Sequence, residues 1–306
     1  MYKKEESSYV QSELQSTRLS NKPGISILIL SLLFLCSAIF SGSFFKTLAS
    51  NGYEFDQLTK SLFGFFIGIL VFMIIVPYFL GLPNGKTTLK DYLHTIGIRK
   101  PQSISKVLLV SLPCIAILFI SWLMASFVYN VYHLHWVESF FISKLSNPSK
   151  ALPPQNLAMI TSIVVIFEEV VFRGIFLTML LKKYSERKSI ILSALAFGLL
   201  HSLNFLNGPL TEELLISVLN QILYTSIHGL FYGYLFVKID CNLIPLMIIH
   251  YIGDSFISFF WYTPYAPFAI FQILMLLFYV GIVPTALLTI WIKFSTGILK
   301  IQKSIK

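Results

Sequence analysis

The residues best suited to chemistry are two adjacent glutamates and an arginine inside an apolar segment. Glu168, Glu169 and Arg173 stand in a stretch that is otherwise predominantly apolar from residue 157 to residue 181. This stretch is long enough to cross a bilayer as a helix. A charge at membrane depth costs roughly a few kcal/mol or more. The three groups therefore need partners, protonation or water, and a functional role follows as a hypothesis.

The spacing predicts different roles for the two glutamates. Glu169 and Arg173 are four residues apart with the acid first, which is the favourable order for an ion pair on a helix. Glu168 lies about 100° further round the helix, so it cannot share that pairing equally. We predict that Glu169 neutralises Arg173 and that Glu168 stays free for chemistry. A buried polar cluster that only locks helices together is the alternative, and this segment alone leaves both open.

Two histidines and an aspartate extend the set. His201 and His250 each lie in a separate apolar segment, and Asp254 follows His250 by four residues, on the same helix face. Counted at the helix rise from the cytosolic ends, Glu168, His201 and Asp254 lie about 21, 18 and 17 Å deep. Polar residues of three segments are thus expected at a similar depth in the membrane. We expect His228 to be a packing or hydrogen-bonding residue.

Water activation is the chemistry that this set can perform. A carboxylate beside an imidazole can hold and deprotonate a water molecule. A second imidazole and a polar side chain can stabilise the oxyanion formed at an attacked carbonyl. Glu168, His201 and His250 could instead bind zinc and leave a position open for water. The sequence contains no GxSxG, HExxH or P-loop pattern.

Three motifs in this order resemble those of the CPBP family, the CAAX-processing and bacteriocin-processing (Abi-type) intramembrane proteases. The family motifs are EExxxR, FxxxH and HxxxN or HxxxD. The sequence matches them at 168–173, at 197–201 and at 250–254, within a segment of about 150–260. The resemblance implies an all-helical bundle of eight spans, with an active site inside the membrane that is open toward the cytosol.

The resemblance also implies a role for each motif residue. Glu168 and His201 would activate the hydrolytic water, and His250 with Asp254 would form the oxyanion site. The residues that would shape and support the pocket are Glu169 and Arg173. Asp254 stands where members that process prenylated proteins have asparagine. Asparagine can donate to an oxyanion and an ionised aspartate cannot, so Asp254 would have to be protonated, orient His250 or help to hold a metal.

Composition predicts a polytopic, all-α membrane protein. The chain has 306 residues, of which 56% are hydrophobic and 12% charged, and its mean hydropathy is +0.75. We expect one transmembrane domain over residues 25–292, a polar cytosolic tail over 1–24 and a basic cytosolic tail over 293–306. The eight expected spans are 25–45, 61–82, 107–130, 157–181, 189–205, 214–237, 243–260 and 268–292.

Further features refine this arrangement. Leu89, Tyr92, Leu93 and Ile96 recur at helical spacing, which predicts a short interfacial helix within 87–99. Gly229 and Gly233 form a GxxxG pair that permits close helix approach. The three cysteines show neither a disulfide framework nor metal-site spacing.

The distribution of charge predicts the orientation. Five segments, 1–24, 83–106, 182–188, 238–242 and 293–306, carry 18 of the 23 Lys and Arg residues. Basic loops of this kind face the cytosol, so we expect both termini there and the plasma membrane as the location. The same rule accounts for the net charge of +9 without a nucleic-acid partner.

The sequence thus favours an intramembrane endopeptidase that cleaves a membrane-associated peptide or protein within the lipid bilayer. We expect no required cofactor, and zinc is the alternative. The competing interpretation is a non-catalytic immunity or scaffold protein of the bacteriocin self-immunity type. A transporter ranks third, because no paired broken-helix pattern supports it.

Overall fold

The computed structural model describes most of the chain. The described residues are 19–53, 57–65, 75–82, 88–101, 103–132, 154–207, 209–260 and 277–304. Within these ranges the chain is all-helical and contains no strand, which confirms the predicted fold class. Most of the expected N-terminal tail and of the loop 131–156, and parts of the second and eighth expected spans, lie outside the described residues.

The helices follow the apolar segments closely. The longer ones are α2 (Pro23–Ser50), α6 (Ile104–Tyr132), α8 (Pro154–Glu169), α10 (Glu186–Leu200), α11 (Glu212–Lys238), α12 (Leu243–Phe260) and α14 (Val283–Ser304). The shorter ones are η1 (Leu19–Asn21), α3 (Gln57–Phe65), α4 (Val76–Phe79), α5 (Leu89–Thr95), η3 (Val170–Leu177), α9 (Thr178–Leu181), η4 (His201–Asn207) and η5 (Leu277–Ile282).

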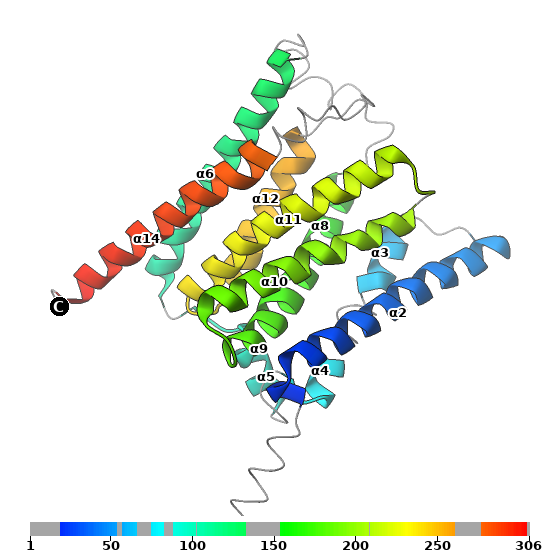
Figure 1. Ribbon diagram of the computed structural model, residues 1–306, viewed down its shortest axis with the longest axis horizontal. Coiled ribbons are helices and arrows are strands. Elements are labelled where there is room, and N and C mark those ends of the chain that lie inside the picture. The colour runs from blue at the N-terminus through cyan, green and yellow to red at the C-terminus, as the bar shows by residue number, and fades with distance from the viewer. Residues whose placement is uncertain are drawn as a thin grey trace, which may run out of the picture.

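The long helices lie side by side in a slanted bundle, with α6 and α14 along one side and α2 along the other (Figure 1). Helix α10 packs on α11, α12 packs on α6 and α8, and α14 packs on α6 and α11. Helix α8 runs into η3 and then α9, and η3 contacts α10, α11 and α12. The segment that follows the two glutamates is therefore surrounded by α12, which carries His250, and by α10, which ends directly before His201.

The surface and the interior reverse the usual distribution of residue types. Leu112 and Phe294 are each 59% exposed, whereas Glu169 and Arg173 are at most 1% exposed. Large apolar side chains on an outer surface mark contact with other apolar material, and lipid provides it along a whole bundle. Among the described residues, two helical segments are long and apolar enough to cross a membrane, Glu186–Phe205 and Leu214–Lys238.

Glycine allows α10 and α11 to approach closely. A Cβ added to Gly198 would lie 1.8 Å from Oγ of Ser226, and one on Gly229 would lie 3.0 Å from Cα of Ala194. Gly233 comes similarly close to α10, because its Cβ would lie 3.1 Å from a methyl carbon of Ile190. The packing role predicted for the GxxxG pair is confirmed.

The fourth expected span departs from a uniform α-helix directly after the glutamate pair. Residues Val170–Leu177 form the π-helix η3, whose wider turn changes the direction of the side chains that follow. Two hydroxyl groups donate hydrogen bonds to backbone carbonyls of η3. Ser193 of α10 donates to the carbonyl of Phe172 at 2.7 Å, and Thr178 donates to that of Arg173 at 3.2 Å. The sequence predicted one continuous helix here. The contact between Ser193 and Phe172 joins two different segments, so the pattern within this segment could not indicate it.

A short helix, α5, is present where the interfacial helix was expected. Thr88 caps it by accepting from the backbone N–H of Asp91 at 3.2 Å. Tyr92 is buried, whereas Lys90 and His94 are exposed, so the helix is amphipathic as predicted. The loop that follows is joined to the start of α12, because the N–H of Leu243 donates to the Gly97 carbonyl at 2.9 Å.

Candidate active site

Glu169 is the centre of a fully buried set of interactions. Its Oε1 accepts from Nη1 of Arg173 at 3.1 Å, which is the predicted pair. The same oxygen lies 2.6 Å from Nδ1 of His250, which comes from α12. Glu169 therefore connects two of the three motifs, and its position is fixed from two sides.

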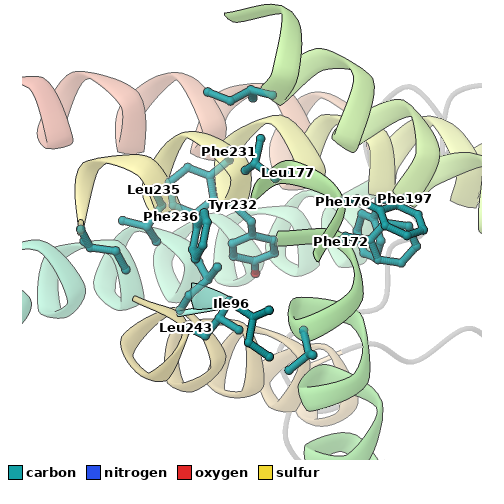
Figure 2. Close-up of a cluster of buried hydrophobic side chains, with 14 of the residues drawn as sticks. Ile96, Phe172, Phe176, Leu177, Phe197, Phe231, Tyr232, Leu235, Phe236 and Leu243 are labelled. Carbon is teal, nitrogen blue, oxygen red and sulfur yellow. The ribbon is translucent and has the colours of Figure 1, made fainter. Parts of the chain in front are cut away.

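Arg173 is held between aromatic rings as well as by Glu169. Its guanidinium carbon lies 4.4 Å from the ring centre of Phe197 and 5.4 Å from that of Tyr232. Figure 2 shows these two rings within the buried apolar cluster. The described residues give no hydrogen-bond partner to Nε and Nη2 of Arg173 or to Oε2 of Glu169. Cation–π contacts thus carry much of the stabilisation of this buried cation.

Glu168 is placed quite differently from its neighbour. Its Oε1 lies 3.8 Å from Nε2 of His201, and its Oε2 lies 3.7 Å from Nε2 of His250. Both distances are too long for a direct hydrogen bond. The Glu168 side chain is 15% exposed, whereas that of Glu169 is fully buried. Glu168 thus stands between two imidazoles without a direct hydrogen bond to either.

His201 lies where α10 gives way to the tighter helix η4. Its Nδ1 is 3.0 Å from the carbonyl oxygen of Phe197, one turn earlier. A carbonyl can only accept, so Nδ1 carries the hydrogen and donates it. The Nε2 lone pair of the neutral ring then faces Glu168. Phe197 therefore contributes its carbonyl to the orientation of His201 and its ring to Arg173.

His250 presents its other nitrogen to the site. Nε2 lies 3.7 Å from Glu168 and 3.5 Å from Oδ2 of Asp254, while Nδ1 is bound to Glu169. If Nδ1 donates to Glu169, Nε2 carries a hydrogen only when the ring is an imidazolium. Three carboxylates around one ring provide the negative charge that such a cation needs. Asp254 is the most exposed of them, at 29% for its side chain.

The structure brings together all six residues predicted from the motifs, which come from the end of α8, from η3, from the start of η4 and from the middle of α12. The bond between Glu169 and His250 was not predicted, because these residues are 81 positions apart. Sequence reasoning also missed Tyr232, whose ring centre lies 4.4 Å from that of His250 at an angle of 30°. The only sequence signal for Tyr232 was its position one helical turn after His228.

In the zinc alternative, the ligands would be Glu168, His201 and His250. Among the described residues, no group of three or more His, Cys, Asp or Glu side chains is arranged to hold a metal ion. Nδ1 of His250 is bound to Glu169 and Nδ1 of His201 to the Phe197 carbonyl, so Nε2 of each ring faces Glu168. Bonds of this kind at the second ring nitrogen also occur in zinc sites, so they do not distinguish the zinc alternative from metal-free hydrolysis.

A small apolar pocket, with a volume of about 20 Å³, lies between α2 and η3. Its walls include Phe167 and Leu200, the residues directly before Glu168 and His201, and Leu30 from α2. The pocket therefore adjoins the two chain segments that carry Glu168 and His201.

Comparison with known proteins agrees with the motifs. Residues 150–256 match the family model described as type II CAAX prenyl endopeptidase Rce1-like. The match covers all three motifs and confirms the resemblance to the CPBP intramembrane proteases. No curated protein and no solved structure matches the chain. The matched segment is thus similar to a family of membrane-embedded proteases, and the apolar helices agree with a membrane protein.

Proposed function

We propose that this protein is an intramembrane endopeptidase that cleaves a membrane-associated peptide or protein with a water molecule activated by Glu168 and His201. The observation that carries the proposal is the contrast between adjacent carboxylates. Glu169 is buried and committed to Arg173 and His250, whereas Glu168 is partly exposed between two imidazoles. A cluster that served packing alone would leave no reason to keep Glu168 unlocked at membrane depth.

The first step uses two acceptors. Oε1 of Glu168 and Nε2 of His201 are 3.8 Å apart, so one water molecule can donate a hydrogen bond to each. A lone pair of that water then points away from both groups. When the water oxygen attacks the scissile carbonyl carbon, Glu168 takes up one of its protons as a general base.

The second step returns the proton. The carbonyl oxygen becomes an oxyanion, which the Nε2–H of an imidazolium at His250 can stabilise. Collapse of this intermediate breaks the C–N bond, and Glu168 passes its proton to the departing nitrogen. Glu169 fixes His250 through Nδ1 and so positions its Nε2 toward the reacting carbonyl.

The apolar pocket suits an apolar part of the substrate. It opens between α2 and η3 and is lined largely by apolar side chains. A substrate that is anchored in the membrane brings apolar groups near the cleaved bond, and this pocket would bury them. Asp254 replaces the asparagine of the members that process prenylated proteins, so the proposed substrate class is membrane-associated peptides and proteins in general.

The proposed topology is multi-pass, in the plasma membrane, with both termini in the cytosol. It follows from the loop charges, and it places the site nearer the cytosolic face. Single cysteines introduced in 131–156 and in 182–188, in a background without the native cysteines, should differ in their labelling by an impermeant reagent. In intact cells we expect labelling of the first loop only, and external labelling of 182–188 would contradict this orientation.

Membrane proteomics tests the activity directly. Cells that express the wild type are compared with cells that express Glu168→Gln at the same level. We expect at least one membrane-associated precursor to accumulate in the variant, with its cleaved product confined to the wild type. Identical protein profiles, together with an unchanged biological effect of the variant, would favour the non-catalytic immunity or scaffold role.

A further inference from the structure

His201 stands at a change of helix type, and α11 contacts the chain on both sides of that change. Helix α10 ends at Leu200, and the 3₁₀-helix η4 begins with His201 and runs for seven residues. Helices of this type rarely exceed about four residues, because their hydrogen-bond geometry is poor. Contacts with other parts of the protein must therefore stabilise η4, and with it the position of His201.

The first contact with α11 lies three residues before His201. Helices α10 and α11 lie side by side (Figure 1) and approach closely at Gly198. A Cβ added to Gly198 would lie 2.7 Å from the backbone carbonyl oxygen of Ile222. The last turn of α10 is thus packed directly against the backbone of α11. The same turn contains Phe197, whose carbonyl binds Nδ1 of His201 at 3.0 Å.

The second contact with α11 lies three residues after His201. Nδ2 of Asn204 in η4 donates to Oε1 of Gln221 in α11 at 2.7 Å. Side chains three residues apart share one side of a 3₁₀-helix, so this bond holds the side of η4 that carries His201. Both amides belong to segments that are apolar enough to cross a membrane. Polar side chains in such segments join neighbouring helices by hydrogen bonds.

The proposed mechanism depends on the distance between His201 and Glu168. Nε2 of His201 lies 3.8 Å from Oε1 of Glu168, which is too long for a direct hydrogen bond, so Glu168 does not fix the imidazole. The Phe197 carbonyl fixes the ring relative to α10 alone. The place of His201 relative to Glu168 therefore depends on how the end of α10 and the start of η4 are held against α11.

We infer that Asn204 and Gln221 are positioning residues, whose hydrogen bond holds His201 at the distance from Glu168 at which both bind the same water molecule. This inference rests on the proposed protease function and adds two residues that lie outside the three motifs. Both act through His201 and not on the substrate. The alternative is that the bond only joins η4 to α11 and leaves the reaction unaffected.

The test uses the full-length protein in phosphatidylcholine and phosphatidylglycerol vesicles. The probe is a quenched fluorescent peptide that spans a cleavage site found in the comparison of wild type with Glu168→Gln. Gln221→Met and Asn204→Leu each remove one amide and retain an apolar side chain of similar size. The exchange variant, Asn204→Gln combined with Gln221→Asn, moves one methylene group across the pair and can form the bond again.

The matched control is Thr225→Val on the same helix. The Thr225 hydroxyl donates to the backbone carbonyls of Gln221 and Ile222 within α11, so the control removes a hydrogen bond of α11 without removing the contact with η4. It should match the wild type in kcat.

Gln221→Met and Asn204→Leu should each lower kcat about 10–100-fold with little change in KM, because a displacement of about 1 Å can cost that much. Their combination should be no slower than either alone, since both remove the same bond. The exchange variant should recover at least about tenfold in kcat over the single variants. Melting temperatures should stay close to that of the wild type, because interhelical hydrogen bonds in membranes contribute little on average.

A second measurement follows His201 without using activity. The protein is labelled with nitrogen-15 at histidine, and His201→Gln identifies the ring signals of His201 in the magnetic resonance spectrum. We expect these signals to shift or broaden in Gln221→Met, to return in the exchange variant and to be unchanged in Thr225→Val. A bond that served packing alone would leave the His201 ring as it is in the wild type.

The inference is overturned if folded Gln221→Met and Asn204→Leu match the wild type in kcat or in the signals of His201, or if the exchange variant stays as slow as they are. In each of these cases the wild type still cleaves and Glu168→Gln does not, so the proposed function stands. If instead the wild type and Glu168→Gln leave the same peptides intact in cells and in vesicles, the proposed function fails and the inference fails with it.

Discussion

The candidate site has two sides, which differ in how deeply their side chains are buried and in whether these are bound to one another. The supporting side consists of Glu169, Arg173 and Phe197, which are all at most 2% exposed and bound to one another or to His250. The side that we propose to be reactive consists of Glu168, His201 and Asp254, which are partly exposed and at least 3.5 Å from the nearest charged partner of the site. Charges in a membrane protein can therefore be neighbours in sequence and still differ in whether they are available for chemistry.

The largest expected effect is on the reactive side. Glu168→Gln removes the base and retains the shape of the side chain, so cleavage should fall about 10³–10⁴-fold. Protein abundance and the melting temperature should remain close to those of the wild type, because no short contact of Glu168 is lost. Cleavage of the peptide probe in vesicles measures the first quantity, and cleavage at the wild-type rate would remove Glu168 from the mechanism.

Glu169→Gln changes the supporting side, and it should lower stability, which Glu168→Gln leaves unchanged. It leaves Arg173 without a counter-ion in the interior, which costs about 3–5 kcal/mol for a buried pair. Abundance and melting temperature should both fall, and activity should fall with them because His250 loses its fixed orientation. Glu168→Gln is the matched control, and equal stability of the two variants would contradict the distinction between the two sides.

A smaller effect is expected from a substitution on α10, which packs against η3. Ser193→Ala removes the hydroxyl that donates to the Phe172 carbonyl in η3 and should cost about 1–3 kcal/mol of stability. If this bond holds the π-helix, activity should also fall, because the direction of Glu168 relative to Arg173 depends on the turn between them. Ser226→Ala on α11 is a suitable control, since its hydroxyl donates only within its own helix. A stable, fully active Ser193→Ala would show that η3 does not depend on this contact.

Asp254→Asn is expected to have the smallest effect on the wild type, and it distinguishes the two hydrolytic models. Without a metal, activity should be retained or rise by several-fold, most clearly at alkaline pH. The reason is that a carboxyl group loses its proton as pH rises and then donates nothing, whereas the amide donates at every pH. In a zinc-dependent site the same change should weaken metal binding, since nearby carboxylates support bound cations.

Metal analysis of the purified protein, with activity measured before and after chelation, separates these models. Stoichiometric zinc that is lost together with activity would establish the metal-dependent alternative. Activity that persists through chelation, combined with an active Asp254→Asn, would favour hydrolysis by Glu168 and His201.

Much of the helical framework could be predicted from the sequence. The expected span 243–260 coincides with α12, and the span 214–237 differs from α11 by at most two residues at either end. These boundaries follow from apolar stretches that end at charged or polar residues, which is a local property of the chain. The pairing of Glu169 with Arg173 was predictable for the same reason, because it depends only on helical spacing.

The sequence by itself determined which residues could act and on which helices they stand. The tertiary structure decided which of these residues bind one another and which do not. Whether Glu169 or Glu168 binds His250 depends on how α12 packs against α8 and η3, and the π-helix receives a hydrogen bond from a hydroxyl of α10. The position of Tyr232 beside His250 depends likewise on the packing of α11 around them. Such contacts join residues far apart in the chain, so periodicity and spacing within one segment carry no information about them.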